Sequence, residues 1–213
     1  MIIVISDTEL FSGETNIVNQ LFDNGLLLFH LRKYNNSKSE MIQFVNAIKP
    51  EYRNRIVLHQ FHEIANDLEI NRLHFSEKDR ANLKEQELTQ LREKNMVLST
   101  SVHSVEEYTK LPSVFDYTFL SPVFDSISKP DYKAHAFDLT TKKSSGIKLI
   151  ALGGVNEDNC MNACQIGFDG VALLGSIWKS ENKIESFKNV SRRLTQMNSQ
   201  SLADVFLRAS ARN

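Results

Sequence analysis

Eight short runs of apolar and β-branched residues recur along the chain, and longer segments with helix-like spacing of apolar positions separate most of them. Such runs predict buried strands, because a strand covered on both faces is apolar along most of its length. The runs span residues 2–7, 26–32, 55–60, 72–77, 97–102, 117–124, 148–154 and 170–175. Strands that alternate with helices predict βαβ units and a parallel sheet.

Helical spacing is clearest at residues 16–24, 39–48, 81–94, 156–167 and 185–197. Eight strands fit a closed barrel better than an open doubly wound sheet, which usually has about five or six. We therefore expect residues 1–213 to form one α/β domain, a single-domain (β/α)8 TIM barrel. Segment 125–146 is polar and weakly patterned, which predicts an extended loop after the sixth strand and a candidate active-site lid.

The charges of the chain nearly cancel, with 25 Lys and Arg against 26 Asp and Glu and a formal net charge of −1. This balance argues against a nucleic-acid or membrane-surface partner. No apolar run is long enough to span a bilayer, and the first residues lack the basic flank of a signal peptide. With two cysteines that have no zinc-ligand neighbours, we expect a cytoplasmic protein. The sequence leaves the oligomeric state open, a homodimer included.

Two predicted strands end in glycine just before a helix, at Gly153–Gly154 and at Gly175, which Ser176 follows. One explanation is a tight turn that needs the backbone freedom of glycine. The other is that backbone N–H groups approach an anion. In a (β/α)8 barrel, the loops after the seventh and eighth strands commonly bind phosphate, so the paired loops favour the second explanation.

Polar residues at the other strand ends are candidates for chemistry, because the active sites of such barrels lie there. Arg32 suits a phosphate or carboxylate through paired hydrogen bonds, or else a structural ion pair. His103 precedes Ser104, which with Glu107 has the spacing of a helix capping box, and it is the main acid–base candidate. The secondary candidates are Asp7, His59 and Gln60, while His62, His74 and His135 are expected at the surface or in loops.

The segments SDTELF, HLR, LHFSEKD, STSVHS, FLSPVFDSISK, ALGGV and GVALLGSI resemble, in order and spacing, the thiamine phosphate synthase/TenI family. The resemblance covers about residues 2–180. It implies a (β/α)8 barrel that acts on the thiazole phosphate precursor of thiamine. It also implies a set of phosphate contacts, namely Ser126, Ser128, Gly154, Gly175 and Ser176, with Gly153 beside them.

The chain departs from the synthase pattern at several positions that the resemblance identifies. Arg32 is kept, but Tyr34 stands where the synthase has a lysine. His59 and Gln60 replace an Asn-Asp pair whose Asp binds Mg²⁺. The second Mg²⁺ carboxylate is kept as Asp79, and two pyrophosphate contacts are kept as Ser101 and Lys129.

These departures favour the thiazole tautomerase (TenI) branch, an isomerase that aromatises a thiazole carboxylate phosphate by moving a proton. Such an enzyme needs a phosphate site and an acid–base residue, which would be His103, and requires no cofactor. The alternative is a thiamine phosphate synthase, a transferase that uses Mg²⁺ to couple hydroxymethylpyrimidine pyrophosphate to thiazole phosphate. A second alternative is a non-catalytic barrel that binds thiazole or thiamine phosphates and regulates. Each alternative has a small phosphorylated partner and neither a nucleic acid nor a membrane.

Overall fold

The computed structural model describes the backbone of residues 1–125, 137, 139 and 146–210, and side chains as far as residue 196. Eight parallel strands pair in chain order, and the last pairs with the first to close a barrel. They are β1 (Ile2–Ile5), β2 (Leu28–Leu31), β3 (Ile56–Leu58), β4 (Arg72–Phe75), β5 (Val97–Val102), β6 (Tyr117–Leu120), β7 (Lys148–Ala151) and β8 (Gly170–Leu173). The predicted α/β class and (β/α)8 barrel are confirmed.

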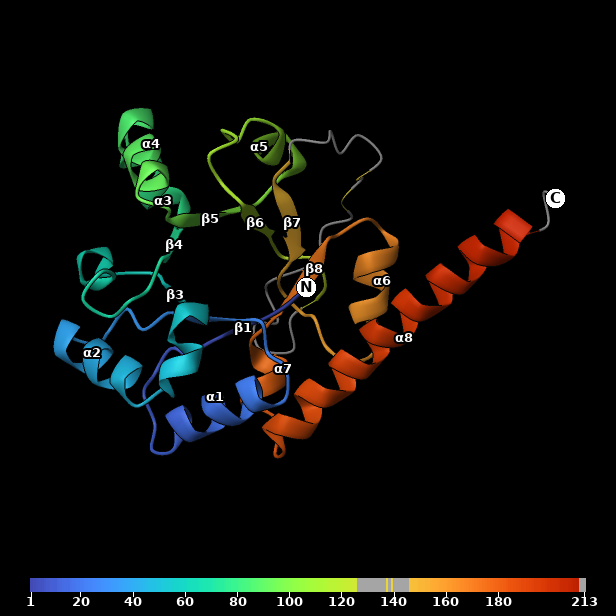
Figure 1. Cartoon of the computed structure of the whole chain (residues 1–213), viewed down its shortest axis with the longest axis horizontal. Coiled ribbons are helices and arrows are strands. Elements are labelled where there is room, and N and C mark those ends of the chain that lie inside the picture. Colours follow the sequence, from blue (N-terminus) through green and yellow to red (C-terminus); the bar gives the residue numbers. More distant parts are fainter. Residues whose placement is uncertain (126–136, 138, 140–145, 211–213) are drawn as a thin grey trace.

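Helices lie outside the barrel (Figure 1). They are α1 (Glu14–Asp23), α2 (Lys38–Asn46), α3 (Glu77–Asn82), α4 (Glu85–Glu93), α5 (Val105–Thr109), α6 (Cys160–Gln165), α7 (Gly175–Trp178) and α8 (Lys183–Ser210), with short 3₁₀ helices η1 (Pro50–Arg55) and η2 (His62–Ile64). The long helix α8 packs against α1, α6 and α7. Among the described residues, no helix combines the length and apolar character needed to cross a bilayer.

The predicted helix over 81–94 is divided in two. Leu83 adopts an extended backbone between α3 and α4 and packs against the core, which ends the first helix and lets Lys84 begin the second. The apolar spacing persists across this break, so the pattern alone does not reveal it.

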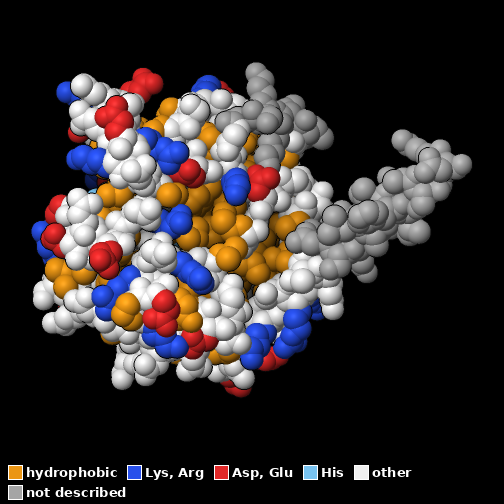
Figure 2. All heavy atoms as spheres, viewed as in Figure 1, with side chains coloured by type: hydrophobic (Ala, Val, Ile, Leu, Met, Phe, Trp, Pro, Cys, Tyr) orange, Lys and Arg blue, Asp and Glu red, His pale blue; other side chains and the backbone are white. Residues whose placement is uncertain are grey.

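Side chains alternate between the barrel interior and the surrounding helices, as the pleat of each strand requires. In β2, Phe29 and Leu31 pack outward in the main core, while Leu28 belongs to a second cluster inside the barrel. His30 also faces inward, against Phe119. On the face shown in Figure 2, hydrophobic side chains gather in a central hollow, and lysine and arginine side chains lie around it.

Hydrogen bonds fix the C-terminal ends of β1 and β2 and the short helix α7 relative to one another. The Ser6 hydroxyl accepts from the Arg32 backbone N–H at 2.9 Å and donates to the Arg32 carbonyl at 3.1 Å. The Trp178 indole N–H in α7 donates to the Ile5 carbonyl at 2.6 Å. These bonds hold the backbone of Arg32 and the end of α7 at the same end of the barrel.

A buried ion pair involves Lys33, the residue that follows Arg32. The Lys33 ammonium is fully buried and contacts both carboxylate oxygens of Glu14 at 2.7 and 2.8 Å, and it also donates to the Glu9 carbonyl at 2.7 Å. Burial raises the pKa of the Glu14 carboxyl, and the hydrogen bond and charge of Lys33 oppose that rise. Lys33 thus ties the β2 end to α1 rather than supplying a cation to the strand ends.

We predict that Glu14→Ala lowers the free energy of unfolding by about 3–5 kcal/mol, because it leaves the Lys33 ammonium buried without its carboxylate. The double variant Glu14→Leu/Lys33→Met should recover much of that loss, since neither charge then remains buried. Urea denaturation measures both effects. The control Glu106→Ala removes the exposed ion pair with Lys110 and should barely change stability. A double variant as unstable as Glu14→Ala would contradict this account.

Candidate functional site

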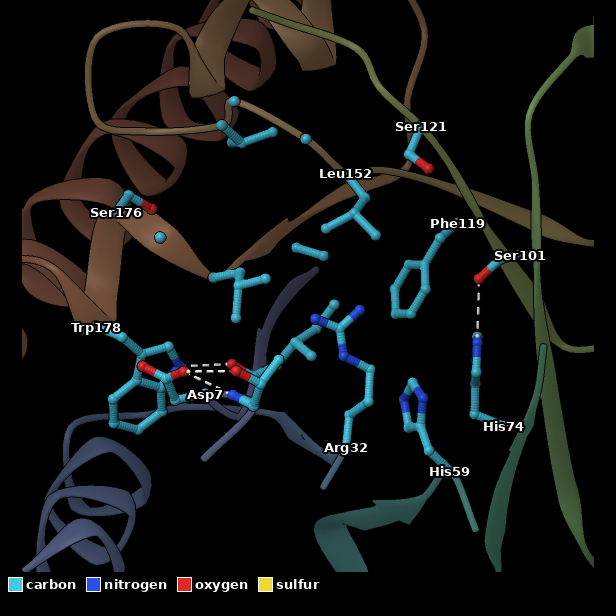
Figure 3. Close-up of a pocket in the computed structure, with 18 of the residues that line it drawn as sticks. Asp7, Arg32, His59, His74, Ser101, Phe119, Ser121, Leu152, Ser176 and Trp178 are labelled. Carbon is cyan, nitrogen blue, oxygen red and sulfur yellow. Dashed lines mark hydrogen bonds between the residues drawn. The ribbon is translucent and has the colours of Figure 1, made fainter. Parts of the chain in front are cut away.

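A cavity of about 840 Å³ opens at the C-terminal ends of the strands (Figure 3), within the size range typical of small-molecule sites. The loops after all eight strands contribute to its lining. The predicted candidates that line it are Asp7, Arg32, His59, Ser101, His103, Gly153, Gly154, Gly175 and Ser176. Residues from separate parts of the sequence therefore meet at one cavity. Ser126, Ser128, Lys129 and nearly all of the suggested lid lie outside the described residues.

Three residues that line the cavity have a buried side-chain atom without a hydrogen-bond partner among the described residues; one is His59, through Nδ1, and the other two can donate to an anion. The two donors are Arg32 Nε and Ser176 Oγ. Unpaired buried polar atoms are costly, so such atoms at a cavity indicate groups that a ligand satisfies. A guanidinium N–H and a hydroxyl can both donate to an anion.

The double glycine has a structural explanation of its own. Gly153 and Gly154 have φ of +93° and +67°, which side-chain-bearing residues rarely adopt. A Cβ on Gly154 would lie 2.5 Å from the carbonyl oxygens of Phe124 and Asp125, and one on Gly153 would lie 2.9 Å from Pro122 Cα. Backbone packing alone therefore requires both glycines, and they are not by themselves evidence for an anion.

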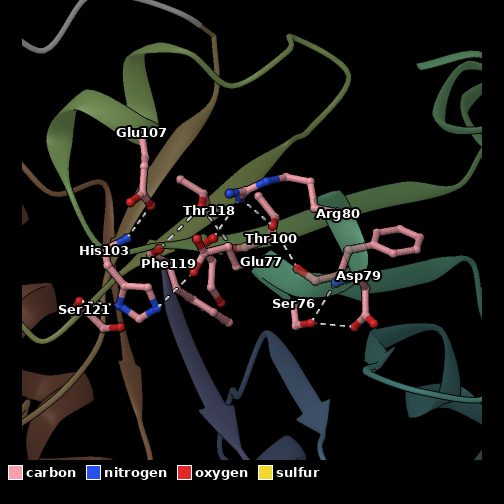
Figure 4. Close-up of polar contacts among 12 residues, drawn as sticks. Ser76, Glu77, Asp79, Arg80, Thr100, His103, Glu107, Thr118, Phe119 and Ser121 are labelled. Atoms are coloured by element: carbon pink, nitrogen blue, oxygen red, sulfur yellow. Dashed lines mark hydrogen bonds and ion pairs between the residues drawn. The ribbon is translucent and has the colours of Figure 1, made fainter. Parts of the chain in front are cut away.

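His103 lies at the edge of the cavity, just before α5 (Figure 4). Its Nδ1 is 3.0 Å from the Ser121 carbonyl oxygen, which can only accept, so Nδ1 carries the proton and Nε2 of the neutral ring is free to take one. Glu77 lies on that side, with 3.9 Å between Nε2 and its carboxylate. Ser104 caps α5 as predicted, but the Glu107 carboxylate accepts from the His103 backbone N–H instead of that of Ser104.

Three buried histidines lie together at the cavity, where His59 and His74 are part of the lining and His30 contacts His59. Two of the three were missed by sequence reasoning. His30 was not a candidate, and the expectation that His74 is a surface or loop residue was wrong, since it is only 2% exposed. His59 stacks on His74 with ring centroids 4.1 Å apart. We call His30, His59 and His74 the histidine cluster.

Burial keeps the histidine cluster uncharged. It is the first cause of the lowered pKa of each ring, which falls well below the ordinary value for His30 and His59 and to about 3 for His74. Neighbouring positive groups, Arg32 among them, add to the effect. The rings are therefore neutral imidazoles near neutral pH.

Asp7, Gln60 and Asp79, the remaining candidates, already make hydrogen bonds within the protein. The Asp7 carboxylate lines the cavity but accepts from the Thr8 backbone N–H at 2.6 Å. Gln60 is not among the lining residues; its amide donates to the Lys33 carbonyl at 2.8 Å. Asp79 is also outside the lining, and its carboxylate accepts from the Ser76 hydroxyl at 2.6 Å at the start of α3.

Comparison with known proteins identifies the family. The family model described as "Thiamine monophosphate synthase" (TMP-TENI) matches residues 2–177. The chain belongs to the TMP-TENI family. This membership places it among the enzymes of thiamine biosynthesis.

Individual relatives agree with this assignment. The chain is 24% identical over 193 residues to thiamine-phosphate synthase of Bacillus cereus, with 84% of each protein covered. It is 24% identical over 193 residues to that of Methanococcus maripaludis, with 88% of this chain and 91% of the relative covered. A thiamine phosphate pyrophosphorylase structure from Bacteroides thetaiotaomicron is 25% identical with a TM-score of 0.70, covering 90% of this chain and 95% of that one.

A Pyrococcus furiosus structure shares the fold, with a TM-score of 0.74 at 20% identity and coverage of 92% and 95%. None of these names refers to a tautomerase.

The TMP-TENI resemblance implies Mg²⁺ carboxylates at the positions of Gln60 and Asp79, and the residues present do not fit that role. Gln60 is neutral and bonded to the backbone, while Asp79 is exposed and bonded to Ser76. Mg²⁺ favours carboxylate oxygens that share the site with substrate phosphates. Neither side chain is directed at this cavity, so we derive no reaction step through Mg²⁺.

We predict that the histidine cluster makes stability depend on pH in chelator-containing buffer. The unfolded chain takes up protons below about pH 6.5, whereas the folded chain keeps these rings neutral. The free energy of unfolding should therefore fall between pH 7.5 and 5.5, by about 1.4 kcal/mol for each such histidine.

Urea denaturation across this pH range measures the fall in the free energy of unfolding. His30→Gln should reduce that fall by the amount that one histidine contributes. A stability that does not change between these pH values would mean that the rings are charged or hydrated in the native state.

Proposed function

We propose that the chain binds a thiazole phosphate in this cavity and moves a proton on it, as a thiazole tautomerase of the thiamine pathway. The observation that carries the proposal is His103, whose bond to the Ser121 carbonyl leaves Nε2 as a basic nitrogen at the cavity edge. A proton transfer needs a positioned base and a site that holds the substrate.

The anionic part of the substrate fits the two unpartnered donors. Arg32 Nε and Ser176 Oγ are buried at the cavity, and each has hydrogen-bonding capacity that the described residues do not use. A hydrogen bond from a guanidinium to a phosphate is charge-assisted and stronger than one between neutral groups. The backbone of Arg32 is fixed by Ser6, which preorganises this contact.

His103 would act as the general base at Nε2. It takes a proton from the thiazole ring while Nδ1–H continues to donate to the Ser121 carbonyl. The Glu77 carboxylate, 3.9 Å from Nε2, would stabilise the positive charge that the ring then carries. Returning the proton to a second position on the substrate completes the tautomerisation without a change in total charge or oxidation state.

A second candidate function is thiamine-phosphate synthase, which the names of the relatives favour over the tautomerase. The chain is less suited to it at the pyrophosphate end of the reaction. Tyr34 replaces the expected lysine, and the neighbouring Lys33 is buried against Glu14 and cannot take its place. Departure of pyrophosphate develops negative charge that cations normally offset.

A paired assay of the purified protein separates the two candidates. One reaction contains hydroxymethylpyrimidine pyrophosphate, thiazole phosphate and Mg²⁺; the other contains the unaromatised thiazole carboxylate phosphate with excess chelator. We expect turnover in the second reaction. Robust Mg²⁺-dependent coupling in the first, with no turnover in the second, would establish the synthase instead. Ligand binding without turnover in either would favour a regulatory barrel.

We predict that His103→Asn lowers kcat for tautomerisation by about 10²–10⁴-fold, the usual contribution of a general base, with little change in ligand affinity. Steady-state kinetics and calorimetric binding measure the two quantities. His62→Asn is the matched control, because His62 lies outside the cavity lining and should retain turnover. Full turnover in His103→Asn would place the base elsewhere, and joint loss of binding and turnover would mean that His103 is structural.

A further inference from the structure

We propose that the histidine cluster binds one late first-row transition-metal ion, Zn²⁺ in the first instance, at the floor of the cavity. The three side chains come from neighbouring strands, β2, the end of β3, and β4. Each offers a nitrogen, and the three nitrogens lie within 4.8 Å of one another in a buried setting. This inference does not depend on the proposed tautomerase activity.

The chemistry of the donors selects the ion. Three imidazoles with no carboxylate in the cluster suit Zn²⁺, Co²⁺, Ni²⁺ or Cu²⁺ and are poor ligands for Mg²⁺ or Ca²⁺. Neutral imidazole is the form that binds a metal. Zn–N bonds of about 2.0–2.1 Å place tetrahedral ligands about 3.3 Å apart. His30 Nδ1 and His59 Nε2 are already 2.9 Å apart, so modest ring rotation can bring the set to that spacing.

The outer contacts of the cluster match those of metal-binding histidines, which commonly hold one ring nitrogen on the protein and give the other to the ion. His30 Nε2 is 2.7 Å from the Tyr117 hydroxyl, and His74 Nδ1 is 2.9 Å from the Ser99 hydroxyl. Ser99 in turn donates to the Leu73 carbonyl. These contacts leave His30 Nδ1 facing His59 Nε2 at 2.9 Å and His74 Nε2 facing the Ser101 hydroxyl at 3.1 Å. A bound ion would take the place of these two hydrogen bonds.

His59 supplies an independent indication of a missing partner. Its Nδ1 is buried and has no hydrogen-bond partner among the described residues, although the side chain is only 6% exposed. A buried, unpaired ring nitrogen costs about 1–3 kcal/mol unless something engages it. If either nitrogen of His59 binds an ion, the other is left to a cavity ligand or water.

The cluster is accessible from the cavity. His59, His74 and Ser101 line it (Figure 3). His30 is not among the lining residues; it is fully buried and contacts His59. Three histidine ligands and a fourth position open to a cavity are the arrangement of catalytic zinc sites rather than structural ones. The fourth position would take water or an oxygen donor of a bound ligand.

The first test is direct metal binding to the tag-free, full-length chain after removal of metal with a chelator. Calorimetric titration with Zn²⁺ should give one site per chain. Co²⁺ should give the visible absorption of a low-coordinate site, and X-ray absorption of the Zn²⁺ form should show three imidazoles. Absence of stoichiometric binding of both ions would overturn the proposal and leave the cluster as a hydrogen-bonded network.

Variants then locate the site. His59→Gln should weaken Zn²⁺ binding by at least about 100-fold, since even outer contacts of metal ligands contribute 10–100-fold. His62→Gln is the matched control and should bind as the unmodified chain does, because His62 bonds to the Leu58 carbonyl outside the cluster. Unchanged Zn²⁺ affinity in His59→Gln would overturn the assignment. So would a loss of Zn²⁺ affinity in His103→Gln, because that result would place the ion at the contact between His103 and Glu77.

A third variant tests the site without replacing a buried histidine, in case a histidine variant does not fold. Tyr117→Phe keeps the buried ring but removes the hydroxyl that contacts His30 Nε2, so Zn²⁺ affinity should fall by about 10–100-fold. Tyr108→Phe removes a buried hydroxyl that donates to the Ile147 carbonyl, away from the cluster, and should leave affinity unchanged. Circular dichroism and Tm of the metal-free proteins establish that each is folded. Equal affinities in both tyrosine variants would contradict the proposed geometry.

Discussion

The side chains inside the barrel are largely buried, so their polar atoms must bond to one another or to a ligand. This constraint organises the site. Inside the barrel the demand is largely met: His30 contacts His59 and Tyr117, and His74 contacts Ser99 and Ser101. The buried side-chain atoms left without a partner among the described residues include His59 Nδ1, Arg32 Nε and Ser176 Oγ. All three belong to residues that line the same cavity, which supports the proposal that a ligand binds there.

The framework behind the cavity explains why these groups can remain unpaired. Lys33 and Glu14 neutralise each other, and Ser6 fixes the backbone of Arg32, whose side chain lines the cavity. Its Nε has no partner among the described residues. Trp178 anchors α7 to β1 and thereby places Ser176 at the same opening. These atoms without a hydrogen-bond partner therefore lie where a ligand can bond to them.

Much of the fold was predictable from the sequence, because few compact folds accommodate eight apolar runs that are separated by segments with helical spacing. The barrel, the closing helix after residue 181 and the meeting of Arg32, Ser101 and Ser176 followed from that pattern. Side-chain direction was harder to predict. In the run RLHFSE, apolar and polar residues do not alternate cleanly, and only strand pairing shows that His74 faces inward.

The directions of the Gln60 and Asp79 side chains could not be predicted from the sequence either. A motif fixes a position in the sequence, but a hydrogen bond to Lys33 or Ser76 decides where the side chain points. The sequence allowed two explanations of the double glycine, a tight turn and an anion site. Only the packing distances to Phe124 and Asp125 show that backbone crowding is one reason for glycine there.

The central claim is that Arg32 and Ser176 make this cavity a site for a phosphorylated ligand. Calorimetry at fixed ionic strength, comparing thiazole phosphate with the same thiazole alcohol lacking phosphate, tests it most directly. The account predicts at least about tenfold tighter binding of the phosphate, since one charge-assisted hydrogen bond contributes about 1.5–3 kcal/mol. Equal affinity for the two compounds would contradict it.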